Sequence, residues 1–227
     1  MEQFCIHGRQ IAVFAPDAPG GVIVYFHGDE KQAAEVWQLL PEPKPVLAAI
    51  SGVDWNADLS PWPAKHAFRG GSDFAGHADA YLTELTEQII PELERVLSLV
   101  PAARCLAGYS LAGLFAAYAP YRTALFDRIA SMSGSLWFDG FAEFACRPFV
   151  RAPEYAFFSL GDREKQTRSV RMAAVEDCTR AVVERYRSCG VPTDFVMNPG
   201  GHFQAGSQRV ADGIAYVLRM PARQERG

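Results

Sequence analysis

The stretch "RCLAGYSLAGLFAAY", residues 104–118, decides the fold because an apolar strand pattern runs directly into a helix pattern. Ser110 stands at the junction, with Gly108 two positions before it and Ala112 two positions after it. A sharp turn from strand to helix needs small neighbours, and this framing is typical of a nucleophilic serine. Ala112 replaces the second glycine of the usual pattern, so a serine with only a structural role in a tight turn is the alternative.

Apolar runs of strand length alternate with helical spacing along the rest of the chain. Buried strands are predicted over 20–28, 45–52, 103–110, 127–135, 154–161 and 193–199. Helices are predicted over 76–97, with a kink or break at Pro91, over 111–119, over 166–189, and after Ser207 as the cap of a last helix. Strands that alternate with helices favour a mostly parallel sheet covered on both faces. We therefore expect an α/β fold in one domain spanning 1–227.

Composition and charge narrow the functional class. The chain has 227 residues and a net charge of −4, with charges of both signs interspersed, so no nucleic-acid partner is expected. No apolar run has the length of a membrane span, and the N-terminus lacks a signal-peptide pattern. Five widely spaced cysteines without a C-x-x-C pair indicate reduced thiols and a cytoplasmic location. His66 and His77 lack ligand-like framing, so we expect neither a metal nor another cofactor.

Three polar loops follow predicted strands and should meet at one edge of the sheet, because parallel strands end there together. A serine nucleophile needs a base, and the base needs an orienting acid. His202, in "NPGGHF" after the last strand, is the candidate base. "SLGDREKQTR" offers Asp162 and Glu164 as acids. In folds of this kind the acid commonly comes three residues after a glycine that ends the strand. This spacing favours Glu164, with Asp162 as the alternative. The order serine, acid, histidine is that of α/β-hydrolases.

Backbone N–H groups should stabilise the negative charge that develops on the substrate oxygen. The N–H of Leu111 begins the helix after the serine, and the N–H of Asp29 follows "YFHG". Gly28 allows a tight turn there, and we expect the Asp29 carboxylate to point away. Trp137 should line the substrate pocket, and Tyr109 and Gly28 should lie beside the substrate.

The segment 53–76 differs from the rest of the chain because it is rich in aromatic residues, proline and glycine. Such a long connection inside a compact domain is often functional. We interpret it as a wall or lid over the same edge of the sheet, with Trp55 and Trp62 anchoring it to the core.

The chain resembles the putative-esterase family of α/β-hydrolases, and most of all its branch of enterochelin (siderophore trilactone) esterases. The resemblance is carried by "YFHGDE", "VDWNADLSPWPA", "GYSLAGLFA", "SMSGSLWFDGF", "FFSLGDREKQTR" and "GGHF", which run from residue 25 to residue 203. It implies that Ser110 matches the nucleophile, His202 the base, and Glu164 or else Asp162 the acid.

The resemblance implies a serine esterase acting on a small-molecule ester, and it leaves the substrate open because the family also contains S-formylglutathione hydrolases and mycolyl acyltransferases. An acyltransferase with the same triad is the nearest alternative function. A non-catalytic member that binds a ligand or a partner is a further alternative, and its mark would be a lost serine, histidine or oxyanion loop. The sequence leaves the oligomeric state open.

Overall fold

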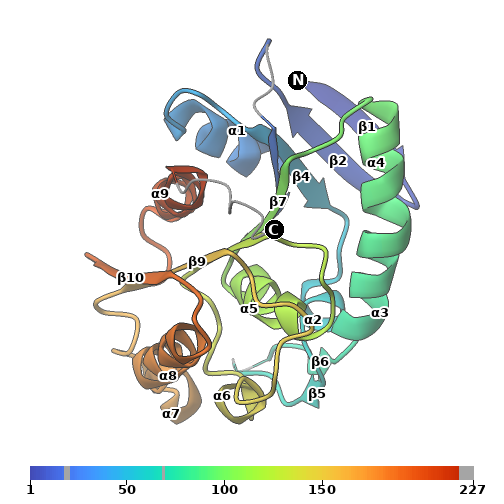
Figure 1. Ribbon diagram of the computed structural model, residues 1–227. Coiled ribbons are helices and arrows are strands. Elements are labelled where there is room, and N and C mark those ends of the chain that lie inside the picture. The colour runs from blue at the N-terminus through green and yellow to red at the C-terminus, as the bar shows by residue number, and fades with distance from the viewer. Residues whose placement is uncertain (18–20, 68–69, 220–227) are drawn as a thin grey trace.

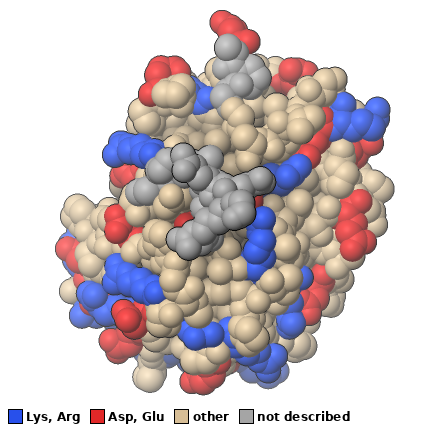
Figure 2. Space-filling model, in the orientation of Figure 1, with Lys and Arg blue, Asp and Glu red and all other residues tan. Residues whose placement is uncertain are grey.

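The computed structural model describes residues 1–17, 21–67 and 70–219. Parts of three predicted segments lie outside these ranges. They are residue 20 of the first predicted strand, residues 68–69 of the aromatic segment and residues 220–227 of the predicted domain. Acidic and basic side chains intermingle over the face drawn in Figure 2. In the described ranges no helix has both the length and the apolar character needed to cross a membrane.

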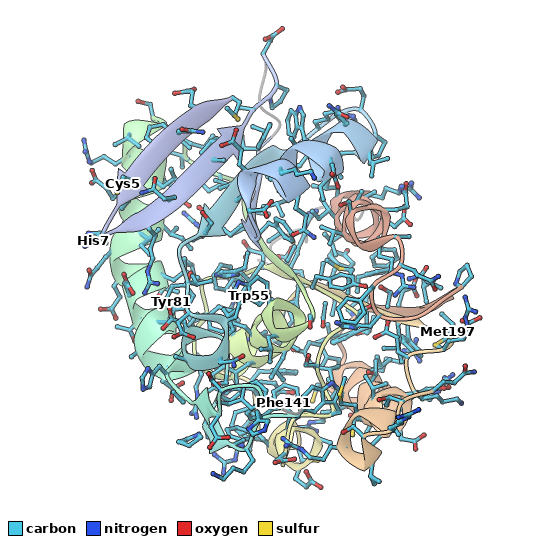
Figure 3. The ribbon with its side chains drawn as sticks, turned by 180° about the vertical axis from the view of Figure 1, so that it is seen from behind. Cys5, His7, Trp55, Tyr81, Phe141 and Met197 are labelled. Atoms are coloured by element: carbon cyan, nitrogen blue, oxygen red, sulfur yellow. The ribbon has the colours of Figure 1, made fainter. Side chains whose placement is uncertain are left out.

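An eight-stranded, mostly parallel sheet forms the centre of the molecule (Figure 1). Its strands, in sheet order, are β1 (Glu2–Ile6), β2 (Arg9–Phe14), β4 (Val46–Ser51), β3 (Val22–His27), β7 (Ala103–Tyr109), β8 (Arg128–Met132), β9 (Tyr155–Gly161) and β10 (Thr193–Asn198). From β4 to β10 all neighbouring strands are parallel, whereas β2 pairs antiparallel with both of its neighbours, β1 and β4. Cys5 and Met197 mark the two edges of the sheet in Figure 3. The predicted α/β fold is confirmed.

Helices cover both faces of the sheet, as Figure 1 shows. One face carries α1 (Glu30–Leu39) and α9 (Gly206–Arg219), and the other carries α3 (Ala78–Glu84), α4 (Ile90–Val96), α5 (Leu111–Tyr118) and α8 (Val175–Ser188). Alternate residues of β3 point to opposite faces of the sheet. Val24 and Phe26 therefore pack with α1 and α9, while Ile23 and Tyr25 pack on the other face. This double burial explains why the parallel strands read as continuous apolar runs.

The predicted helix 76–97 is continuous, but it is distorted just before Pro91. A π-helical turn, η1 (Leu85–Ile89), joins α3 to α4. Proline cannot donate the usual backbone hydrogen bond, and the widened turn accommodates that loss without breaking the helix.

Two helix boundaries differ from the sequence-based expectation. The helix predicted over 166–189 begins only at α7 (Val170–Ala173), where the Ser169 side chain accepts a hydrogen bond from the Met172 N–H. Ser207 does not cap the last helix, because α9 begins at Gly206 and the Ser207 hydroxyl donates to Glu35 on α1 at 2.7 Å.

Several short elements were not predicted. They are α2 (Trp55–Asp58), the two-stranded ribbon of β5 (Pro63–Ala64) and β6 (Phe74–Ala75), the 3-10 turn η2 (Ala119–Tyr121) and α6 (Phe141–Phe144). Helix α1 was also missed, because only Ala33 and Val36 of its residues are buried, which is too narrow an apolar stripe to stand out.

Candidate active site

Ser110 occupies a strained turn between β7 and α5. Its φ of 59° and ψ of −122° lie in a region that residues with a side chain rarely adopt. The Ser110 N–H donates to the Met132 carbonyl, and its own carbonyl accepts from the Ser135 N–H at 3.0 Å. A Cβ on Gly108 would lie 2.2 Å from the Ala112 carbonyl oxygen, so glycine is required before the serine. The predicted sharp turn is confirmed.

Three side chains from distant parts of the chain form a hydrogen-bonded row. His202 Nε2 lies 3.0 Å from Ser110 Oγ, and His202 Nδ1 lies 2.7 Å from Glu164 Oε2. The three residues follow β10, β7 and β9, so the carboxyl edge of the sheet brings them together as expected. Both distances fit transfer of a proton from the hydroxyl to the imidazole.

The Glu164 carboxylate is buried, with 4% of the side chain exposed, and it is fully hydrogen-bonded. Its Oε1 accepts from Ser133 Oγ at 2.7 Å, from the Gly161 N–H at 2.7 Å and from Arg209 Nη1 at 2.9 Å. Burial alone would raise the pKa of Glu164, but hydrogen bonds from His202, Ser133 and the Gly161 N–H outweigh burial and lower it. An ionised Glu164 keeps the proton on Nδ1 of His202, which leaves Nε2 able to accept a proton from Ser110.

Asp162, the alternative acid, is placed differently. Its side chain is 54% exposed, and its Oδ1 accepts from the Gly200 N–H at 2.8 Å. It therefore ties the loop after β9 to the backbone that precedes His202, whereas Glu164 contacts the imidazole itself.

The two predicted oxyanion donors are available for a further hydrogen bond. Leu111 is the first residue of α5, so its N–H has no acceptor within the helix. The Asp29 N–H donates to no acceptor in the described ranges, and the Asp29 carboxylate caps α1 by accepting from the Gln32 N–H at 2.8 Å. Their role in binding an oxyanion stays a prediction.

A cavity of about 100 Å³ opens beside Ser110. It is lined by Asn56, His66, Ala67, Gly71, Ser72, Phe74, Ser110, Leu111, Ser135, Trp137, Met172 and His202. Trp137 lies in the wall of this cavity and its contact with substrate stays a prediction, while Tyr109 and Gly28 are not in this wall. The Tyr109 hydroxyl instead donates to the His202 carbonyl at 2.5 Å, and the Gly28 N–H donates to the Ile50 carbonyl at 3.2 Å. Both residues therefore support the backbone near the cavity.

The segment 53–76 supplies half of the residues that line the cavity, and its role as a wall or lid stays a prediction. Trp62 anchors it, because its indole N–H donates to the Asp139 carbonyl at 2.9 Å and its ring packs against Phe138 and Phe144. Trp55 is 40% exposed, so the predicted anchoring applies to Trp62 much more than to Trp55.

Sequence reasoning missed Ser133, Ser135 and Arg209. Ser135 Oγ lies 3.4 Å from Ser110 Oγ, and Ser133 and Arg209 both contact Glu164. The motif "SMSGS" at the end of β8 could have indicated the two serines, because it lies at the same sheet edge. Arg209 has no such signal, since it looks like one more charge on an amphipathic helix. In the described part of the chain, no three His, Cys, Asp or Glu side chains gather as a metal site would require.

The sheet order, the helices on both faces and the strained serine turn define the α/β-hydrolase fold. Residues 9–169 match the family model described as "Putative esterase", so the chain belongs to that family. The uncharacterized protein YbbA of Bacillus subtilis (strain 168) is 34% identical over 132 residues, which cover 55% of this chain and 53% of YbbA. The match therefore spans about half the length of that relative.

Solved structures of the same fold include hydrolases of siderophores. An IroE-like serine hydrolase from Shewanella oneidensis has a TM-score of 0.75 at 18% identity, covering 92% of this chain and 75% of that one. The siderophore hydrolase EstA from Aspergillus nidulans has a TM-score of 0.72 at 20% identity, covering 93% and 91%. At this level of identity the likeness establishes the fold alone.

Proposed function

We propose that the protein is a serine hydrolase that cleaves a small carboxylic ester. Ser110 Oγ attacks the ester carbonyl carbon while His202 Nε2 takes the hydroxyl proton. The N–H groups of Leu111 and Asp29 stabilise the oxyanion. His202 then returns the proton to the departing alcohol, and water, activated by the same imidazole, hydrolyses the acyl-enzyme. Glu164 stabilises the imidazolium that forms in both steps.

One observation carries this proposal, namely the continuous hydrogen-bonded row from Ser110 through His202 to Glu164. The strained backbone of Ser110 supports it, because such strain persists where the surrounding structure enforces it and is concentrated at reactive residues. A non-catalytic member of the fold was expected to lack the serine, the histidine or the oxyanion loop, and all three are present. We propose that 1–227 acts as one catalytic domain, with 53–76 as a wall of its pocket.

The cavity supports a substrate with a small, apolar acyl group. Phe74, Trp137 and Met172 give the cavity apolar walls, and the volume beside Ser110 is limited. Structural neighbours include a ferulic acid esterase and hydrolases of siderophores, so very different esters are cut by this fold. The fold therefore does not identify the alcohol part of the substrate. The pocket restricts the size of the acyl part, because the volume beside Ser110 is limited.

Labelling with a fluorophosphonate probe tests the proposal. The probe should form one adduct, located on Ser110 by peptide mass spectrometry, and S110A should remain unlabelled. S135A is the matched control, because the Ser135 hydroxyl lines the same cavity 3.4 Å from Ser110 Oγ and its loss should leave the adduct on Ser110. A folded wild-type protein that does not react would favour the binding alternative.

A substrate panel then separates the remaining functions. Short-acyl p-nitrophenyl esters, S-acyl-glutathione thioesters and a trilactone siderophore should be compared by kcat/KM. Product analysis in the presence of an added alcohol distinguishes the hydrolase from an acyltransferase. The hydrolase releases the free acid, whereas the acyltransferase forms a new ester.

A further inference from the structure

A single buried guanidinium, that of Arg209 on α9, contacts several loops of the candidate site. The Arg209 residue is 2% exposed. Its Nη1 donates to Glu164 Oε1 at 2.9 Å and to Ser133 Oγ at 2.9 Å. Its Nη2 donates to the carbonyls of Pro199 and Gly201, both at 3.1 Å.

These acceptors come from the ends of three neighbouring strands, and a fourth strand is close. Ser133 follows β8, Glu164 follows β9, and Pro199 and Gly201 follow β10 directly before His202. Tyr109, the last residue of β7, has its hydroxyl 3.4 Å from Arg209 Nη1 and donates to the His202 carbonyl. The guanidinium thus contacts Glu164 itself, the backbone just before His202, and Tyr109, the residue before Ser110.

We propose that Arg209 is a positioning residue that fixes both the Glu164 carboxylate and the His202 loop in line with Ser110. This inference rests on the proposed function. A glutamate side chain has several rotatable bonds, and its two oxygens are interchangeable unless something distinguishes them. Arg209, with Ser133 and the Gly161 N–H, holds Oε1 and so reserves Oε2 for His202.

The second terminal nitrogen of the guanidinium, Nη2, holds the backbone that carries His202. Carbonyls at 199 and 201 point to Nη2, so the backbone just before His202 is held at two places. Because the guanidinium is planar and rigid, the two halves also fix the distance between the Glu164 loop and the His202 loop. A lysine ammonium would keep the charge facing Glu164 but has no planar fork to bridge both loops.

The chain offers a matched control in Arg128. Its residue is also 2% exposed, and its Nη1 donates to the Val217 carbonyl of the same helix α9 at 2.6 Å. Arg128 begins β8, however, and so lies at the end of the sheet opposite to Ser110. Loss of either arginine removes a buried cation, but only Arg209 contacts the candidate site.

The experiment compares R209M, R209K and R128M with the wild type in three measurements. These are the thermal unfolding temperature, the rate constant of fluorophosphonate labelling, and kcat and KM for p-nitrophenyl acetate, taken well below the unfolding temperature. Displacement of a reacting group by about 1 Å costs roughly 100-fold in rate, so R209M should lose about that factor in labelling and in kcat. R209K should be intermediate, and R128M should lose stability while keeping the wild-type rates.

A folded R209M that reacts at the wild-type rate would overturn the inference. If R209M does not fold, R209K decides, because wild-type rates in folded R209K would equally overturn it, and slower rates at a preserved fold would support it. Failure of the proposed function would give different results. The wild type would then be unlabelled, or S110A would keep its activity, whatever the Arg209 variants do.

Discussion

Replacement of Glu164 by glutamine should nearly abolish turnover while leaving the shape of the side chain almost unchanged. Three donors, from Ser133, Gly161 and Arg209, converge on Oε1 and will hold the single amide oxygen there. The new amide NH2 must then face His202 Nδ1, which can no longer donate. The imidazole proton moves to Nε2, the atom that should receive the proton of Ser110.

The magnitude follows from this change of tautomer. In a serine protease triad, the equivalent loss of the carboxylate lowers kcat by about 10⁴-fold, or roughly 5 kcal/mol of barrier. Stability falls too, because the buried Arg209 cation loses its ionised partner, and breaking such a pair costs about 3–5 kcal/mol. The assay is therefore kcat on a p-nitrophenyl ester at a temperature where circular dichroism shows E164Q to be folded.

Asp162→Asn is the matched comparison. Asp162 is largely exposed, and the Gly200 N–H that donates to it can bind an amide oxygen equally well. We expect D162N to lose less than about tenfold in kcat. Equal and small losses in folded E164Q and D162N would refute the reasoning and indicate a serine–histidine dyad without an acid.

Two further predictions concern the pocket and the core. Trp137→Ala should enlarge the acyl side of the cavity and shift kcat/KM from p-nitrophenyl acetate towards the hexanoate, and an unchanged preference would place the acyl group elsewhere. Burial, with a smaller contribution from the charge of Arg9, lowers the pKa of His27 from 6.5 to about 3, so below pH 6.5 the unfolded chain binds a proton that the folded protein does not. The free energy of unfolding should therefore fall by about 1.4 kcal/mol per pH unit as pH drops through this window, and H27N should show a shallower fall in urea titrations. Equal pH slopes in wild type and H27N would contradict this.

The parts of the site that the sequence could predict depend on local residue patterns and on the topology of a parallel sheet. The apolar run before Ser110 and the glycine at 108 are local signals, because a buried strand and a tight turn each restrict residue type over a few positions. The convergence of Ser110, Glu164 and His202 follows from topology, since parallel strands end at one edge. Spacing from Gly161 favours Glu164 over Asp162, but both lie in the same loop, and only the coordinates show which of them contacts His202.

Tertiary contacts account for what the sequence could not indicate. Tyr109 is predicted to lie beside the substrate, yet its hydroxyl donates to the His202 carbonyl. Arg209 lies within an amphipathic pattern, and its partners come from loops that are distant in sequence, so its burial has no local signature. Helix α1 buries only Ala33 and Val36, so its apolar pattern is too sparse to indicate a helix from sequence.

Backbone strain in the described residues supports the location of the site independently of any motif. Five residues other than glycine have positive φ, namely His7, Ser98, Ser110, Ser133 and Ala205. His7 and Ser98 lie in other connections, but Ser110 lines the cavity, and Ser133 and Ala205 lie in the loops after β8 and β10 at the same edge of the sheet. Ser133 donates to Glu164, and the Ala205 carbonyl accepts from the Arg209 N–H. Strained residues are retained where the surroundings enforce them. Here Ser110 and Ser133 also belong to the hydrogen-bonded groups around His202 and Glu164. A chain selected only for stability would have no reason to concentrate strain, a buried carboxylate and a buried arginine at one edge of its sheet, whereas a preorganised reaction site requires that concentration.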